Sequence, residues 1–189
     1  MTVVRGGNGS GKSTLLGIVG GRIRPTSGHV EYGGGLNGEG GLQLGSIGWV
    51  GHDSLCYADL TARQNIEFTA RLHGRDEGRA YEEASERFGL GDFGERPVRT
   101  YSRGQHQRLS IARALVQGPP LVVFDEPTVG LDAAASAVLA RVVREEAGRG
   151  AAVVVATHDS VFADRVADRV LQLRAGRTVC ATAEESRDG

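Results

Sequence analysis

Lysine is nearly absent from this chain of 189 residues: Lys12 is the only one, and arginine supplies the rest of the 22 basic residues. No apolar run approaches the roughly 18 residues that a membrane-spanning helix needs, and the first residues lack the basic-then-apolar order of a signal peptide. A net charge of −1 gives no broadly basic surface for nucleic acid or anionic lipid. We therefore expect a cytosolic protein without a nucleic-acid partner, whose contact with a membrane goes through another protein.

Cysteine is scarce as well. The two cysteines, Cys56 and Cys180, lie far apart and lack metal-ligand spacing, so we interpret them as reduced thiols without a role. The chain is long enough to bury one sizeable core and short for two. We expect one domain over residues 1–189, with a small additional lobe.

Apolar patterns along the chain predict an α/β fold. Strands alternate with helices, which indicates a parallel sheet, and a small helical lobe is expected between about 60 and 95, where Thr61 and Gln64 fit a capping box. Glycine-rich residues 33–45 predict a loop or loose hairpin, and 170–179 a closing hairpin without a functional role. Strands are expected at 1–4, 29–32, 46–50, 121–124 and 152–156, and helices at 13–19, within the lobe, after Ser102 and from about Ala133.

The strongest motif lies between the first strand and the first helix, which is the context that the pattern GxxxxGK[ST] requires. Glycines let backbone N–H groups turn inward around phosphates, and the N-terminus of the helix adds positive charge. Lys12 then reaches the β and γ phosphates, and the Ser13 hydroxyl is offered to Mg²⁺. The motif predicts a mononucleotide site made of Gly6, Gly7, Asn8, Gly9, Ser10, Gly11, Lys12, Ser13 and Thr14.

A second motif follows the apolar strand at 121–124. Asp125 and Glu126 stand at its carboxyl end, where parallel sheets place their ligand sites. We expect Asp125 to hold Mg²⁺ and Glu126 to orient or deprotonate the attacking water. Alone, such a pair would more often be a cap or a salt bridge, but the phosphate loop upstream favours the catalytic interpretation. His158 ends another apolar strand and is expected to touch the γ phosphate and the water.

Between these motifs, residues 101–105 and the helix behind them resemble the signature motif of ABC transporter ATP-binding subunits. The resemblance continues through residues 125–132 to His158 and covers nearly the whole chain. It implies a P-loop ATPase with a helical subdomain at about 60–117, working as a homodimer beneath a membrane permease at the cytoplasmic face of the plasma membrane. It also implies that ATP and Mg²⁺ are sandwiched between the subunits, with Asp132 in the D-loop at the dimer seam. The signature residues, supplied in trans, would be Ser102, Arg103, Gly104 and Gln105, and Arg103 replaces the glycine that is commoner in the family.

A narrower resemblance links residues 51–62 and 70–74 to the haem exporter ATPases of cytochrome c maturation. It places His52 at the Q-loop position, where most of the family has glutamine. Because Mg²⁺ prefers hard oxygen ligands, we expect His52 to act through water; a surface histidine in a coupling loop is the alternative. Haem export is one interpretation, and export of a lipid or a drug is another. A soluble ABC ATPase without a permease is the rival from a different class.

One part of the family pattern is missing. About thirty residues normally precede the phosphate loop in this family and supply strands and an aromatic side chain that stacks on adenine. We expect their absence to lower ATP affinity by about 1–3 kcal/mol, roughly ten- to hundredfold, and to leave the phosphate-loop strand without one neighbour. A misassigned start is favoured over a true fragment, and a chain that no longer hydrolyses ATP is a further alternative.

Overall fold

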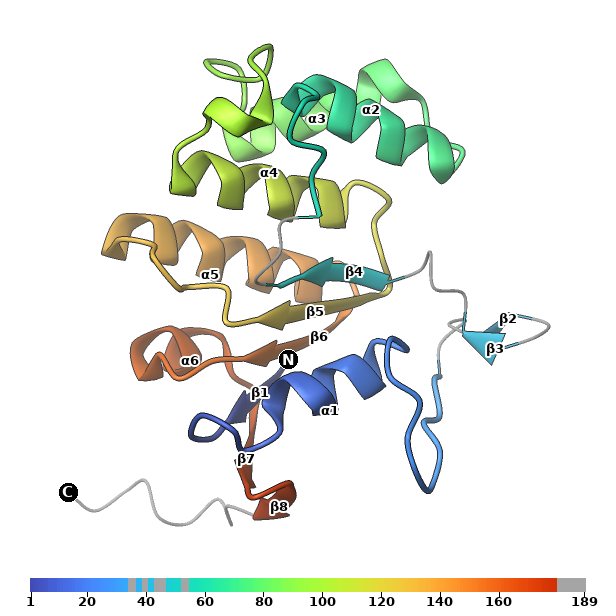
Figure 1. Ribbon diagram of the computed structural model, residues 1–189, viewed down its shortest axis with the longest axis vertical. Coiled ribbons are helices and arrows are strands. Elements are labelled where there is room, and N and C mark those ends of the chain that lie inside the picture. The colour runs from blue at the N-terminus through green and yellow to red at the C-terminus, as the bar shows by residue number, and fades with distance from the viewer. Residues whose placement is uncertain (34–36, 39–40, 43–46, 52–54, 180–189) are drawn as a thin grey trace.

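The computed structural model describes residues 1–33, 37–38, 41–42, 47–51 and 55–179. Its centre is a six-stranded sheet in the order β4-β5-β6-β1-β7-β8 (Figure 1). The first five strands pair in parallel, and β8 pairs antiparallel with β7. The strands are β1 (Thr2–Arg5), β4 (Ile47–Val50), β5 (Leu121–Asp125), β6 (Ala152–Ala156), β7 (Arg169–Arg174) and β8 (Arg177–Val179). This confirms the predicted α/β fold with a parallel sheet.

Strand β1, which leads into the phosphate loop, is flanked on both sides. Thr2 pairs with Val154 of β6 and with Arg169 of β7. The expectation that this strand lacks a neighbour was therefore wrong. That expectation assumed that the neighbouring strand precedes the phosphate loop in the sequence. Both neighbours, β6 and β7, instead come from the C-terminal third of the described chain.

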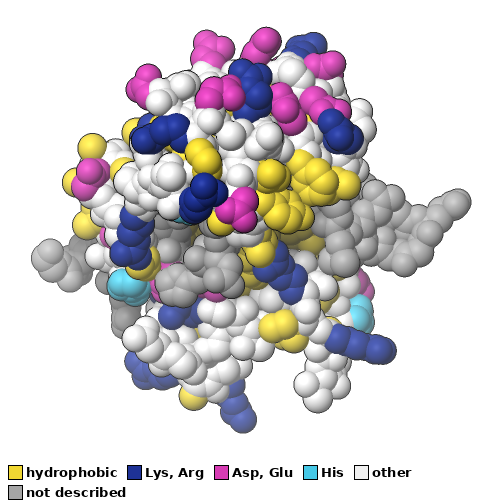
Figure 2. All heavy atoms as spheres, turned by 45° about the horizontal axis from the view of Figure 1, so that its top comes forward, with side chains coloured by type: hydrophobic (Ala, Val, Ile, Leu, Met, Phe, Trp, Pro, Cys, Tyr) yellow, Lys and Arg dark blue, Asp and Glu magenta, His cyan; other side chains and the backbone are white. Residues whose placement is uncertain are grey.

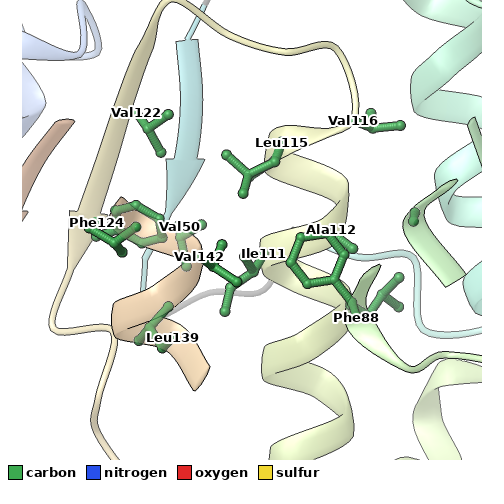
Figure 3. Packing of buried hydrophobic residues seen from close by; sticks show 14 of the residues in the cluster. Val50, Phe88, Ile111, Ala112, Leu115, Val116, Val122, Phe124, Leu139 and Val142 are labelled. Carbon is green, nitrogen blue, oxygen red and sulfur yellow. The ribbon is translucent and has the colours of Figure 1, made fainter. Parts of the chain in front are cut away.

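Side chains of the sheet alternate between two apolar layers. On β5, Val122 and Phe124 belong to the larger buried cluster, while Leu121 and Val123 pack in a second cluster with Leu16 of α1 (Lys12–Val19). A strand buried on both faces reads as a continuous apolar run, as residues 121–124 do. Figure 3 shows Val122 and Phe124 facing the helices of the larger layer.

The larger layer is covered by three helices. They are α4 (Arg103–Leu115), α5 (Ala133–Gly148) and α6 (Ser160–Val166), and Ile111 of α4 lies beside Val142 of α5 in Figure 3. Among the described residues, no helix has both the length and the apolar content needed to cross a bilayer.

A helical lobe stands above this layer (Figure 1). It contains α2 (Ala62–Leu72), α3 (Glu77–Phe88), the short 3₁₀ helix η2 (Val98–Thr100) and α4. The predicted capping box is present, because the Thr61 hydroxyl accepts from the Gln64 N–H while the Gln64 side chain accepts from the Thr61 N–H. The buried side of the lobe consists of the apolar positions that the helical period selects, including Ile66, Ala70, Tyr81, Ala84 and Phe88.

The strand expected at 29–32 is absent from the structure. Residues 29–33 have no strand pairing, and the Tyr32 hydroxyl donates instead to the Val19 carbonyl at the end of α1 (2.8 Å). Further on, β2 (Asn37–Gly38) and β3 (Gly41–Leu42) form a two-residue antiparallel pair. This pair agrees with the loose hairpin expected at 33–45, of which the rest lies outside the described residues.

Gly48 of β4 provides a test of the packing between the lobe and the sheet. A Cβ at this position would lie 2.7 Å from the Ala114 carbonyl oxygen and 2.8 Å from Pro119 Cγ. Because a backbone oxygen has little room to move, Gly48→Ala is expected to lower the free energy of unfolding by about 1–3 kcal/mol. Gly78→Ala in α3 is the matched control, since a Cβ there would meet only Asp76 Oδ1, at an ordinary contact distance of 3.8 Å, and is expected to be neutral or to stabilise by about 0.5–1 kcal/mol. Urea denaturation measures both, and equal midpoints would contradict the packing argument.

Candidate functional site: a phosphate loop at the carboxyl end of the sheet

The glycine loop occupies the turn between β1 and α1, as the motif predicts. Gly9 and Gly11 have φ values of 74° and 100°, which glycine adopts far more readily than other residues. Gly11 is the N-cap of α1 and has no side chain to satisfy the first N–H groups of the helix. These N–H groups therefore remain available for an anion.

The closing hairpin of β7 and β8 supports this loop. The Gly176 N–H donates to the Ser10 carbonyl (2.9 Å), and a Cβ on Gly6 would lie 2.5 Å from the Leu173 carbonyl oxygen. Gly6 is thus required because the hairpin backbone lies directly against the loop. The sequence predicted no functional role for the hairpin. Its contact with the phosphate loop could not be predicted, because the local pattern of residues 170–179 does not indicate which loop packs against them.

Lys12 is buried, with 8% of its side chain exposed. Its ammonium donates to the carbonyls of Gly6 (2.9 Å) and Gly7 (3.2 Å) and lies 3.8 Å from Glu126 Oε1. The single lysine of the chain is therefore held at the loop, next to Glu126, the acid that directly follows β5.

Glu126 also contacts His158. Its Oε2 accepts from the His158 backbone N–H (3.3 Å) and lies 2.8 Å from His158 Nδ1, while the Glu126 N–H donates to the Ala156 carbonyl (2.9 Å). Glu126 has a φ of 50°, which costs a non-glycine residue about 1–2 kcal/mol. Such strain is typical of functional positions. The structure thus brings together the three residues that sequence analysis named as catalytic, from three separate segments.

Oxygen donors suited to Mg²⁺ lie nearby in the fold. Asp125 ends β5, and its Oδ1 is buried without a hydrogen-bond partner. Ser13, the second residue of α1, has an exposed side chain. Among the described residues, no group of three or more His, Cys, Asp or Glu side chains is arranged to hold a metal. Carboxylate and hydroxyl oxygens such as those of Asp125 and Ser13 are of the ligand type that Mg²⁺ prefers.

The segment that resembles the signature motif begins α4. Ser102 is the N-cap, and its hydroxyl and the Gln105 side chain form a capping box. Gly104 faces open space, because a Cβ there would meet nothing within 4 Å. In the described part of the chain, no hydrogen bond or ion pair joins this segment to Lys12, Glu126 or His158.

Two further predicted positions remain. Asp132 is the N-cap of α5 and accepts from the Ala135 N–H (2.7 Å), which is a structural contact within one chain. His52, the expected Q-loop residue, lies outside the described residues.

A glycine loop between a parallel strand and a helix, followed by a lysine and faced by two acids at the end of another strand, defines a P-loop nucleotide hydrolase. The family is shown by comparison with known proteins: residues 1–129 match the family model described as ABC transporter. The chain belongs to this family and carries its ATP-binding domain. ATP hydrolysis is the activity expected of such domains.

Two relatives and one solved structure illustrate the range of similar proteins. The chain is 37% identical to the daunorubicin resistance ATP-binding protein DrrA3 of Streptomyces coeruleorubidus, over 96% of this chain and 59% of that protein. It is 38% identical to the cytochrome c biogenesis ATP-binding export protein CcmA of Paracoccus denitrificans, over 82% of this chain and 68% of that protein. The dimeric ATP-binding cassette MJ0796 bound to ADP and phosphate has the same fold, with a TM-score of 0.81 and 28% identity over 95% of this chain and 83% of that one. The chain thus spans about 59% of the length of the first of these relatives.

Proposed function

We propose that residues 1–189 form one ABC ATP-binding domain, with a helical subdomain at about 60–117, that hydrolyses ATP to drive transport through a separate membrane permease. The observation that carries this proposal is the contact of Glu126 with both Lys12 and His158 at the end of the phosphate loop. A carboxylate placed between a phosphate-binding lysine and a histidine is suited to hold a water molecule against a γ phosphate.

In this mechanism, the loop N–H groups and Lys12 bind the phosphates of ATP. The Lys12 ammonium exchanges its loop carbonyls and Glu126 for phosphate oxygens, a contact between opposite charges. Glu126 then accepts a hydrogen bond from the attacking water and takes its proton as the new P–O bond forms and the bond to the ADP oxygen breaks. His158 holds the Glu126 carboxylate in place through Nδ1.

Asp125 and Ser13 are the residues that would hold Mg²⁺. The unpartnered Oδ1 of Asp125 supports this role, because a buried carboxylate oxygen without a donor is costly unless a cation or water satisfies it. When bound, Mg²⁺ would offset the charge that develops on the phosphate oxygens.

A head-to-tail homodimer completes the proposed site. Ser102 and the N–H groups near Gly104 would close over ATP bound to the second subunit, with Asp132 at the seam between the subunits. Two observations support this arrangement: the open surface at Gly104 and the similarity to a cassette that is dimeric with ADP and phosphate.

The proposed permease contact uses an apolar patch on the lobe. Four large apolar side chains of α2 and the loop before it are exposed, and Leu72 is 67% exposed. The Tyr57 and Phe68 rings pack edge to face with centroids 5.4 Å apart, and Figure 2 shows hydrophobic side chains gathered on this side of the molecule. Such a group is costly to leave in water and is suited to a protein partner, which would place the subunit at the cytoplasmic face of the membrane. The patch comprises Leu55, Tyr57, Phe68 and Leu72.

Haem export for cytochrome c assembly is the finer proposal, and export of another compound, such as a lipid or a drug, is the alternative. The first is supported by the cytochrome c biogenesis relative, and the second by the daunorubicin resistance relative. Cytochrome c content after deletion of the gene separates them: a loss supports haem export, and an unchanged content contradicts it.

Mg²⁺-dependent hydrolysis of ATP by the purified chain tests the proposal directly. We expect phosphate release that requires Mg²⁺, and light scattering should show a dimer that forms with ATP. A folded chain that releases no phosphate and binds no ATP would contradict the proposed activity of residues 1–189.

A further inference from the structure

Glu126 is held in a backbone conformation that its local sequence does not favour. Its φ of 50° lies in the left-handed region, and the next residue is Pro127. A residue before proline is normally confined to extended backbone, so this conformation is unfavourable for two reasons. Such strain persists only where surrounding contacts determine it. The contacts on either side of Glu126 therefore decide where its carboxylate lies.

The sheet fixes Glu126 on its N-terminal side. Asp125 pairs with Ala156 of β6, and the Glu126 N–H donates to the Ala156 carbonyl (2.9 Å). Pro127, on the C-terminal side, cannot be held in the same way, because proline has no backbone N–H. The Pro127 carbonyl is the backbone polar group through which another element can hold it.

Gln107 of α4 supplies this contact. Its Nε2 donates to the carbonyl of the buried Pro127 (3.0 Å). The Val129 N–H, which donates to the Glu126 carbonyl (3.3 Å), belongs to the same turn and moves with it. Among the described residues, Gln107 is the only residue of another helix or strand that forms a hydrogen bond with residues 127–130.

The packing of α4 makes Gln107 a well-placed donor. This helix lies between the rest of the lobe and the sheet (Figure 1), and Leu109 and Ala112 on it are buried. Its first residue lies against the other end of the turn, since a Cβ on Gly130 would be only 2.3 Å from Arg103 Cζ. A donor on a packed helix fixes its partner more precisely than one on a loop.

We propose that Gln107 is a positioning residue for ATP hydrolysis, which holds Glu126 in its strained conformation by way of Pro127. The inference rests on the proposed role of Glu126 and adds the residue that keeps it in place. In the held conformation, the Glu126 carboxylate lies 2.8 Å from His158 Nδ1 and 3.8 Å from the Lys12 ammonium. Without the bond from Gln107, the turn relaxes, and a smaller fraction of chains has the carboxylate in this place.

Kinetics of Gln107→Leu give the first test, because leucine has a similar volume and no donor. We expect kcat to fall about 3- to 10-fold, as the loss of one neutral hydrogen bond predicts. The KM for ATP should stay within about twofold, since Lys12 and the phosphate loop are unchanged. The control is Arg108→Leu, which removes a bond from the same helix to the Gly89 carbonyl (3.2 Å) and should keep its kcat. An unchanged kcat in Gln107→Leu would overturn the proposal.

A double variant separates positioning from a general effect on the fold. If Gln107 acts through the Glu126 carboxylate, Gln107→Leu should cause no further loss of rate in a Glu126→Gln background. Single-turnover hydrolysis with protein in excess over ATP measures these slow rates. The same fold-loss in both backgrounds would show that Gln107 acts independently of the carboxylate, and the inference would fail.

Two more variants keep the test decisive if Gln107→Leu does not fold. Gln107→Glu keeps the length and polarity of the side chain but has no donor when ionised, so its kcat should fall at least as far. Gln107→Lys keeps an N–H donor and should retain more of kcat than Gln107→Glu. A folded Gln107→Glu chain with wild-type kcat, or a Gln107→Lys chain as slow as it, would contradict the role of the donor.

The outcome for Glu126→Gln distinguishes this inference from the proposed function. If that variant is slow while Gln107→Leu keeps its kcat, only the role of Gln107 is wrong. If Glu126→Gln hydrolyses ATP at the wild-type rate, the assigned role of Glu126 is wrong, and the inference falls with it.

Discussion

Replacing Glu126 with glutamine is expected to lower the rate of ATP hydrolysis by about 100- to 10,000-fold, the range that a positioned general base contributes. Glutamine has the shape of glutamate but takes no proton from water. ATP binding should persist, because Lys12 and the loop N–H groups that bind the phosphates are unchanged, and only the charge of Glu126, 3.8 Å from Lys12, is removed. Steady-state phosphate release measures the first effect and equilibrium binding of ATP the second.

A chain that binds ATP without hydrolysing it should also remain dimeric for longer, which light scattering detects. Glu83→Gln is the matched control: it removes a carboxylate charge on α3 that pairs with Arg75 and Arg79, far along the chain from the loop. Near-normal hydrolysis in Glu126→Gln would mean that another group prepares the water.

Replacing Lys12 with alanine is expected to abolish measurable hydrolysis and to weaken ATP binding. A charge-assisted hydrogen bond from a buried ammonium contributes about 1.5–3 kcal/mol, which corresponds to roughly a 10- to 150-fold loss of affinity. Removal of the ammonium also leaves Glu126 beside the phosphates without a compensating cation, and this repulsion adds to the loss. Nucleotide titration monitored by calorimetry measures the affinity directly.

The composition of the chain allows an independent check on Lys12. Because it is the only lysine, an amine-reactive reagent can modify only this side chain and the terminal amine. MgATP should shield Lys12 from the reagent, and mass spectrometry of the loop peptide reports the protection. Arg79→Ala, which removes an exposed positive charge from α3, should leave affinity and protection unchanged. Equal labelling of Lys12 with and without MgATP would contradict its assigned contact.

Local patterns predicted the elements that local forces determine. The continuous apolar run at 121–124 is a strand buried on both faces, and the Thr61 capping box begins α2 where expected. The prediction of a strand at 29–32 was wrong for a non-local reason. An alternating apolar and polar pattern favours a strand only when a partner strand is available, and Tyr32 instead forms a hydrogen bond with the end of α1.

The candidate site was predicted as a set of residues but not as an arrangement. Lys12 begins a helix, and Glu126 and His158 each follow a strand that the apolar pattern of the sequence predicts. Their place at one edge of the sheet could therefore be inferred from the sequence. The support from Leu173 and Gly176 could not, because sheet order decides which loops meet.

The order of the strands also determines when the site can form during synthesis. Strand β1 is made before both of its neighbours, β6 and β7, which are made last of the sheet strands apart from β8. Contacts of such large separation in sequence form slowly, because closing a long loop precedes any gain from pairing. The phosphate loop therefore lacks the support of the β7–β8 hairpin until Gly176 has emerged, and nascent chains that stop earlier should leave one edge of β1 unpaired and depend on chaperones to keep it from aggregating.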